Sequence, residues 1–501
     1  MDTQGHLFVV HGRIHALVHD AAIIPTDSVG TLESHWQDMV DAQLVRQTPL
    51  HHGWAAVQGG VLWLMDAAAD DYSDVLDALE GALQDVAGTV GAARFREGLP
   101  RLVAVPVLGI GAGGYHDDRG TVLKDLIIRL TEIARTLCLD IALVTPEVSV
   151  YSAAQYVRRR YLDTPLPEPL EERASDLGAK ARAGELALFL GAGVSIPAGL
   201  ISWTKLIEEL AGEVKDVSVE DLEHLSPTDQ AELIQKAQPL TESKTPQDFQ
   251  QRVADRVRKA ETPSLIHGLI AGLDVNQVVT TNYDDLFERA VAAADRDAGV
   301  VLPRDSAVGK QRWVLKLHGD AKDPATIVLT RRHMVLFDSA NRPSGALLQS
   351  LFLTKHVLVL GASLTDDNVI RLAHEVDAYK SVHRKDLEFD AFGTVLDVSP
   401  HDNTARGRLW DRQLEWVQLS TKDDRKSGPR HLELLLDRMG MYSTRDSSWL
   451  LDARFEGMLS ESDRLLAQRA RDLAKSLPPR RRDDTWGPLR ERLQDLGAIR
   501  P

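Results

Sequence analysis

The sequence predicts an α/β protein with two α/β domains and a helical C-terminal tail. Short, nearly continuous apolar runs recur along the chain, as in strands that are buried on both faces of a parallel sheet. Segments with helical spacing of apolar residues separate these runs. The chain has 501 residues, which is more than one domain usually holds. Together these observations favour two successive domains of the same class.

The first domain is expected over residues 1–165. Helical spacing predicts two amphipathic helices, at residues 71–90 and 119–137. Strands that alternate with such helices indicate a sheet that is mainly parallel. The strands predicted from apolar runs lie at residues 21–28, 54–66, 101–114 and 140–148.

The boundary between the domains is predicted at a segment that holds Pro165, Pro167 and Pro169 and then becomes charged and helical. The second domain is expected over residues 170–425, with a helical insertion at about 204–270. Its predicted strands lie at residues 186–193, 275–284, 313–320, 325–330, 356–364 and 392–399. A helical C-terminal extension is expected over residues 430–501.

Composition and charge exclude several classes of function. The net charge of −16 works against nonspecific binding to nucleic acid, which needs a basic surface. The chain holds no apolar run of about 18 residues, and its start lacks the basic and then apolar order of a signal peptide. We therefore expect a cytoplasmic protein with no membrane partner and no direct nucleic-acid binding.

The single cysteine, Cys138, excludes an intrachain disulfide and a cysteine zinc site. It lies in the apolar stretch "TLCLDIALV", so we expect a small core residue.

The stretch "GAGVS" follows the first predicted strand of the second domain. Gly191 and Gly193 would let the backbone approach a pyrophosphate, the amide donors of a following helix would point at it, and Ser195 would add a hydroxyl donor. By itself, the same stretch is equally typical of a tight turn between a strand and a helix. Its meaning depends on the other strand ends.

Three later strand ends also carry polar groups. Asn282 is suited to contact a ribose hydroxyl or a water, or to cap the next helix. His318 is suited to act as a general base or to serve as a hydrogen-bonded structural residue. Gly361 and Ser363 suit a ribose or phosphate contact. Because the carboxyl ends of parallel strands meet at one edge of a sheet, we expect all four loops to form one site.

The ordered motifs "GAGVSIPAG", "TTNYD", "LHGD" and "GASLTDDNV" resemble the nicotinamide-dinucleotide-binding domain of the sirtuin superfamily, which has a Rossmann-like fold. The resemblance implies Asn282 and Asp284 at the nicotinamide ribose and His318 as the base, so the implied catalytic residues are these three. The residues it implies at the dinucleotide are Gly191, Ala192, Gly193, Ser195, Thr281, Gly361 and Ser363, the last two near the adenosine ribose.

The sequence departs from the protein-deacylating sirtuins. Their zinc ribbon needs four cysteines, and this chain has one. The segment "GDAKDPATIVLTRRHM" after His318 is similar to the zinc-free bacterial branch, whose members hydrolyse NAD in defence against phage. The resemblance thus implies an NAD+ glycohydrolase that releases nicotinamide and ADP-ribose, uses no metal, and acts as a regulated effector of abortive infection.

The first domain has a second glycine-rich loop after its third predicted strand. Together with "DAAIIPTDS", this loop resembles a macrodomain, a three-layer fold that binds ADP-ribose, and so implies a second candidate nucleotide site. A docking role with a degenerate pocket stays open as an alternative. The residues of this loop are Gly109, Gly111, Ala112, Gly113 and Gly114.

Two other functions stay open at this stage. One is a sensor that binds NAD or ADP-ribose without turnover, and the other is a protein deacylase or ADP-ribosyltransferase that uses the same residues. Because unregulated NAD hydrolysis would kill the host, we expect the activity to be controlled through a homo-oligomer or a complex with a partner protein.

Overall fold

The computed structural model describes residues 4–57, 61–111, 113–162, 166–215, 217–237, 246–297, 299–383, 391–410, 413–420, 424–479 and 485–498. The chain divides into two compact units, and each is treated by itself. The terminal unit consists mainly of Asp2–Glu171 and Asp437–Pro501, and the central unit consists mainly of Glu172–Ala292 and Arg296–Leu436. Both are α/β, as the sequence predicts. No helix among the described residues is long and apolar enough to cross a membrane.

The terminal unit contains a six-stranded sheet in the order β1-β6-β5-β2-β4-β3. All neighbouring strands are parallel except β3 and β4. Strand β1 was not among the predicted strands, and it pairs with β6 along its whole length. The strands are β1 Leu7–His11, β2 Ala21–Thr26, β3 Trp54–Val57, β4 Leu62–Asp66, β5 Leu102–Pro106 and β6 Asp140–Thr145, and the helices before the linker are α1 Ala42–Gln47, α2 Tyr72–Thr89, α3 Arg119–Leu137 and α4 Val148–Tyr161.

The C-terminal helices pack within the terminal unit. Helix α16 (Gly428–Ser443) spans the boundary between the units, and α17 (Glu461–Ser476) and α18 (Gly487–Asp495) follow it. Trp449 and Phe455 are buried in the same apolar cluster as α3, and a Cβ atom on Gly120 of α3 would lie 2.4 Å from the Phe455 carbonyl oxygen. The sequence predicts a separate C-terminal extension from residue 430 onward, but residues of this segment complete the core of the terminal unit.

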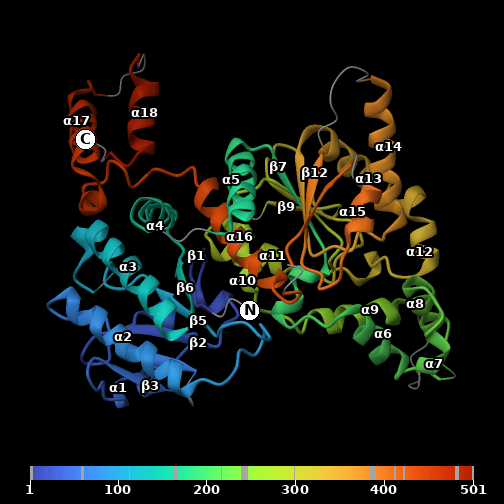
Figure 1. Cartoon of the computed structure of the whole chain (residues 1–501), viewed down its shortest axis with the longest axis horizontal. Helices are drawn as coiled ribbons and strands as arrows, with labels where there is room; N and C mark the ends of the chain where they lie inside the picture. The colour runs from blue at the N-terminus through green and yellow to red at the C-terminus, as the bar shows by residue number, and fades with distance from the viewer. Residues whose placement is uncertain are drawn as a thin grey trace. The chain divides into compact units, whose positions relative to one another are not determined.

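The central unit contains a seven-stranded, fully parallel sheet in the order β13-β12-β11-β7-β8-β10-β9 (Figure 1). The chain starts in the middle at β7, moves to one side through β8 and β10, and returns to β11 on the other side of β7. This doubly wound order creates a topological switch point between β7 and β11. The strands are β7 Leu186–Leu190, β8 Gln277–Thr280, β9 Val300–Leu302, β10 Trp313–Lys316, β11 His356–Leu360, β12 Gly393–Asp397 and β13 Glu415–Gln418.

Helices cover this sheet, and a group of them is inserted between β7 and β8. The inserted helices α6, α8 and α9 form an apolar cluster of their own that includes Leu210, Ile234 and Val253. In Figure 1 they lie beside the sheet, in green. The helices of the insertion are α6 Trp203–Ala211, α7 Val219–Leu222, α8 Pro227–Lys236, α9 Pro246–Val257 and α10 Leu265–Gly272. The others are α5 Glu168–Ala183, α11 Leu286–Ala293, α12 Arg331–Val335, α13 Phe337–Thr354, α14 Asp367–His383 and α15 Thr404–Trp410.

Two expectations about individual segments are wrong. Residues 325–330 form no strand, because a 3₁₀ turn (Pro324–Thr326) opens the segment and the Val328 amide bonds to the His318 carbonyl oxygen. Cys138 is exposed rather than buried. It ends α3 in the left-handed conformation, with φ of 52°, so its side chain projects at the helix end while the neighbouring Leu139 enters the core.

Candidate active site

The two glycine loops of the central unit pack directly against each other at the switch point. The Gly193 amide donates to the Gly361 carbonyl oxygen at 2.9 Å. A Cβ atom on Gly191 would lie 2.5 Å from the Ala362 Cα, and one on Gly193 would lie 2.8 Å from the Gly361 Cα. Gly361 itself has φ of +64°. Glycine is therefore needed here because the loops after β7 and β11 approach each other too closely for a side chain.

The loop after β7 continues into two short 3₁₀ helices, Ala192–Val194 and Ile196–Ala198, rather than into an α-helix. The expectation that the amide donors of a following helix point at a pyrophosphate is wrong for this loop, because the first α-helix begins only at Trp203. Ala192 lies exposed between the two glycines.

Asn282 lies below this loop with a fixed amide orientation. Its Nδ2 atom donates to the Gly191 carbonyl oxygen at 3.0 Å and to Ser195 Oγ at 3.2 Å. Because a carbonyl oxygen can only accept, the amide nitrogen must face Gly191, and Oδ1 faces the other way. Among the described residues, the buried Oδ1 atom has no hydrogen-bond partner. It is an acceptor ready for a ligand hydroxyl or a water molecule.

Ser195 is fully buried and connects the polar groups under the loop. Its hydroxyl donates to Asp284 Oδ2 at 3.0 Å and accepts from Asn282 Nδ2. The His267 Nε2 atom is 3.4 Å from the same oxygen. The Ser195 hydroxyl thus uses its one O–H donor and both lone pairs of its oxygen, and it holds Asn282 and Asp284 in place.

His267, on α10, was not singled out from the sequence. Its Nδ1 atom accepts from the Ser264 amide at 3.2 Å, so Nε2 carries the proton and donates to Ser195. Burial lowers the pKa of His267 to about 4, although the charge of Asp284 opposes this shift. The ring is therefore neutral at pH 7. A single polar residue within "LIHGLIAGL" is the signal that could have found it.

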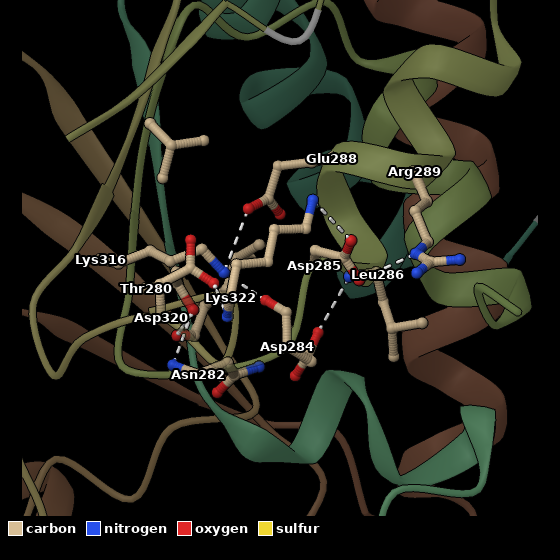
Figure 2. A network of polar contacts seen from close by, with 12 residues as sticks. Thr280, Asn282, Asp284, Asp285, Leu286, Glu288, Arg289, Lys316, Asp320 and Lys322 are labelled. Carbon is tan, nitrogen blue, oxygen red and sulfur yellow. Dashed lines mark hydrogen bonds and ion pairs between the residues drawn. The ribbon is translucent and has the colours of Figure 1, made fainter. Parts of the chain in front are cut away.

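Asp284 both caps α11 and holds Ser195. Its Oδ1 atom accepts from the Leu286 amide at 3.1 Å, at the start of α11, and its Oδ2 atom accepts from Ser195. Its backbone carbonyl accepts from the buried Lys316 (Figure 2). The carboxylate therefore joins the start of α11 to the group around Asn282.

His318 is paired with Asp366, a residue that the sequence analysis did not select. The His318 Nε2 and Asp366 Oδ2 atoms are 2.6 Å apart. Burial raises the pKa of Asp366, but the hydrogen bond and charge of His318 and the amides of Asn368 and Val369 outweigh it, so the pKa lies below its usual value. The carboxylate is thus charged, and its hydrogen bond with His318 orients the ring. The acidic run "TDDN" after β11 was the available signal.

The sheet register brings Asn282 and His318 to the same level. Thr280 pairs with Lys316, and each of the two site residues lies two positions beyond this pair. Among the described residues, the His318 Nδ1 atom has no hydrogen-bond partner, so it is available to a ligand. The loops after β7, β8, β10 and β11 therefore meet at one edge, as the sequence predicts.

The remaining predicted residues lie at the edge of this group. The Thr281 amide donates to the Leu190 carbonyl oxygen at 3.1 Å, which fixes the loop after β8 against β7. Ser363 is exposed, and its hydroxyl is 2.8 Å from that of Thr365. Within the part of the chain that the structure describes, it contacts none of the other site residues, so its place near a ribose stays a prediction.

The glycine loop of the terminal unit follows β5. Gly109 has φ of +82° and packs on Tyr72 and Tyr115, and a Cβ atom on Gly113 would lie 2.4 Å from the Ala67 carbonyl oxygen. These contacts explain two of the glycines by packing within the unit. Ala112 lies outside the described residues, and the predicted nucleotide site at Gly109, Gly111, Ala112, Gly113 and Gly114 stays a prediction.

Comparison with known proteins finds a family model that matches part of this site. Residues 276–400, from β8 to just beyond β12, match the model of the SIR2-like domain. The match includes the motifs at Asn282, His318 and Gly361, and it confirms the resemblance to the sirtuin superfamily that they indicate. The glycine loop after β7 lies before the matched residues.

Relatives of the SIR2-like domain include NAD hydrolases. The chain is 30% identical over 188 residues to the NAD(+) hydrolase ThsA of Acinetobacter baumannii, which covers 36% of this chain and 37% of that protein. It is 28% identical over 204 residues to the ThsA of Bacillus cereus, covering 38% and 41%. It is 24% identical over 241 residues to the defense-associated sirtuin 2 of Bacillus subtilis, covering 46% and 23%. The chain thus spans about two fifths or less of the length of these relatives.

Proposed function

We propose that the SIR2-like domain hydrolyses NAD+ to nicotinamide and ADP-ribose. The observation that carries this proposal is that Asn282 Oδ1 has no hydrogen-bond partner in the part of the chain that the structure describes. It lies at the same sheet edge as His318, which Asp366 orients. Both lie beside two glycine loops at the switch point, where doubly wound sheets bind nucleotides. The relatives named NAD(+) hydrolase support the same reaction.

The chemistry requires a fixed ribose and an activated water. When the bond between the ribose C1′ atom and nicotinamide breaks, positive charge develops on the ribose and nicotinamide leaves with the bonding electrons. Asn282 Oδ1 would accept a hydrogen bond from a ribose hydroxyl or from the attacking water. His318 would take the proton as the water oxygen bonds to C1′, and Asp366 would stabilise the imidazolium.

The biological setting is also part of the proposal. The relative named defense-associated sirtuin supports a role in anti-phage defence. We infer a cytoplasmic effector whose activity is restrained by assembly with itself or with a partner protein. ADP-ribose or a related nucleotide at the glycine loop of the terminal unit is the proposed second ligand.

The test is to incubate purified protein with NAD+ and to measure free nicotinamide and ADP-ribose. We expect Asn282→Ala and His318→Ala to abolish turnover, whereas His401→Ala, which changes an exposed histidine of the same unit, leaves it unchanged. Full turnover by either site variant would refute the assignment. If the wild type binds NAD+ in calorimetry but gives no product, the sensor function replaces the hydrolase.

A further inference from the structure

A buried lysine lies between the strand that leads to His318 and the loop that contains Asn282. Lys316, on β10, is 2% exposed. Its Nζ atom donates to the backbone carbonyl of Asp284 and pairs with Glu288 (Figure 2). The distance from Nζ to Glu288 Oε1 is 3.1 Å. A buried ammonium group is costly unless it is paired and hydrogen-bonded. The Asp284 carbonyl and the Glu288 carboxylate therefore compensate the cost of burying the Lys316 ammonium group.

The partners of Lys316 belong to different segments. Lys316 is the last residue of β10, and His318 follows it by two positions. Asp284 lies in the loop that contains Asn282, and Glu288 lies in the first turn of α11. One side chain thus links the strand of the proposed base to the loop of the proposed ribose contact. The sequence gives no sign of this link, because a lysine within "WVLKLHGD" is also typical of a strand with one solvated residue.

Electrostatics keep the lysine charged despite its burial. Burial lowers the pKa of Lys316, but the charges of Glu288, Asp320 and Asp284 outweigh it, and the net shift is upward. Burial likewise raises the pKa of Glu288, against the opposing charge of Lys316. The charged ammonium has three N–H donors, so it can serve Glu288 and the Asp284 carbonyl at the same time.

We propose that Lys316 is a positioning residue that fixes Asn282 relative to His318. It acts through the Asp284 carbonyl, and the Asp284 carboxylate holds Ser195, which in turn accepts from the Asn282 amide. The inference rests on the proposed function for its catalytic readout. The inference also states that Lys316 keeps the loop at residues 281–284 ordered, and this can be tested without measuring turnover.

The rival explanation is that Lys316 only neutralises Glu288. Removing one member of a buried ion pair leaves an uncompensated charge and destabilises the fold, whereas replacing both members by apolar residues is often tolerated. The double variant Lys316→Met/Glu288→Met therefore separates the two explanations. It removes both charges, and with them the donor to Asp284.

The test compares Lys316→Met, the double variant and Lys322→Met. Lys322 is the matched control, because it is a largely exposed lysine that pairs with the neighbouring Asp285 at 2.8 Å. We expect the double variant to recover thermal stability but to keep kcat about 10- to 100-fold below wild type, with KM changed less than about threefold, because the glycine loops remain intact. Lys322→Met should keep both constants.

Hydrogen exchange supplies the readout that does not need activity. We expect amides in residues 281–285 to exchange faster in the stable double variant than in the wild type or in Lys322→Met. Unchanged exchange there, or recovery of kcat together with stability, would overturn the positioning role. If the wild type itself lacks turnover, the proposed function fails, and the exchange data still decide for or against the role of Lys316.

Discussion

At the scale of single residues, some side chains of the site could be predicted from the sequence and others could not. Asn282 and His318 stand out because each follows an apolar strand, where parallel sheets place their functional groups. His267 lies within a helix and Asp366 in an acidic run beyond β11, so neither directly follows a strand, and their roles arise from contacts with residues 72 and 48 positions away. Contacts at such separations are set by the fold.

The pair of His318 and Asp366 gives a prediction for catalysis. Asp366→Asn keeps the shape of the side chain but removes the charge that orients the ring, so we expect kcat for NAD+ hydrolysis to fall by about 10²- to 10⁴-fold. The control is Asp367→Asn, at the exposed neighbouring carboxylate. Equal rates for Asp366→Asn and wild type, measured as nicotinamide release, would show that His318 works without this partner.

His267 gives a prediction for stability. Its folded pKa of about 4 lies below the value of about 6.5 in an unfolded chain. The unfolded state therefore binds more protons between these pH values, so the free energy of unfolding falls as pH drops through this window, by about 3 kcal/mol from this group. We expect His267→Gln to show a smaller loss in urea unfolding between pH 7 and pH 4. The same loss in variant and wild type would contradict the burial of a neutral ring.

At the scale of elements, most of the strands were predictable and their pairing was not. Continuous apolar runs identify β7 and β11, whereas β9 and β13 are short and partly exposed and give little signal. The predicted strand at residues 325–330 is wrong, because its apolar Ile327 and Leu329 are buried by the helical insertion rather than by strand pairing. An apolar run indicates that a segment is buried, whereas the elements packed around it determine whether its backbone forms a strand.

The contact between the glycine loops gives a prediction at this scale. Gly193→Ala would place a Cβ atom 2.8 Å from the Gly361 Cα, so the two loops must separate. We expect a higher KM for NAD+ and a loss of about 1–3 kcal/mol in the free energy of unfolding. Gly212→Ala is the control, because a Cβ atom there makes only ordinary contacts, the nearest at 3.6 Å. An unchanged KM in Gly193→Ala would show that the loops do not bind the dinucleotide.

At the scale of the whole molecule, residues far apart in sequence complete the terminal unit. Asp437 of α16 is buried, and it pairs with Arg158 of α4 and lies 2.8 Å from His6 Nε2. Burial raises the pKa of Asp437, but the charge of Arg158 and the hydrogen bond from His6 outweigh it, and the pKa falls well below its usual value. A buried charge pair thus joins α16 to α4 within the terminal unit.

This pair predicts a large effect of one substitution. Asp437→Asn leaves Arg158 buried without a counter-charge, and we expect a loss of about 3–5 kcal/mol in the stability of the terminal unit. In the wild type, the contribution of Asp437 is present above about pH 4, where the unfolded carboxyl is ionised, and is lost as pH falls further. Urea unfolding tests this with Asp472→Asn, an exposed carboxylate of α17, as control. Equal midpoints for the two variants would refute the assignment.

The sequence by itself determined the α/β class, the helical insertion and the order of the four loops that carry the site. These features are local, because apolar periodicity and strand-end residues depend on neighbours in the chain. Only the tertiary structure decided that the buried Ser195 holds Asn282 by a hydrogen bond and that Asp366 and Lys316 contact the site. It also decided that the segment from residue 437 onward completes the terminal unit. These features depend on burial and on hydrogen bonds between distant segments, which exist only once the sheets have formed.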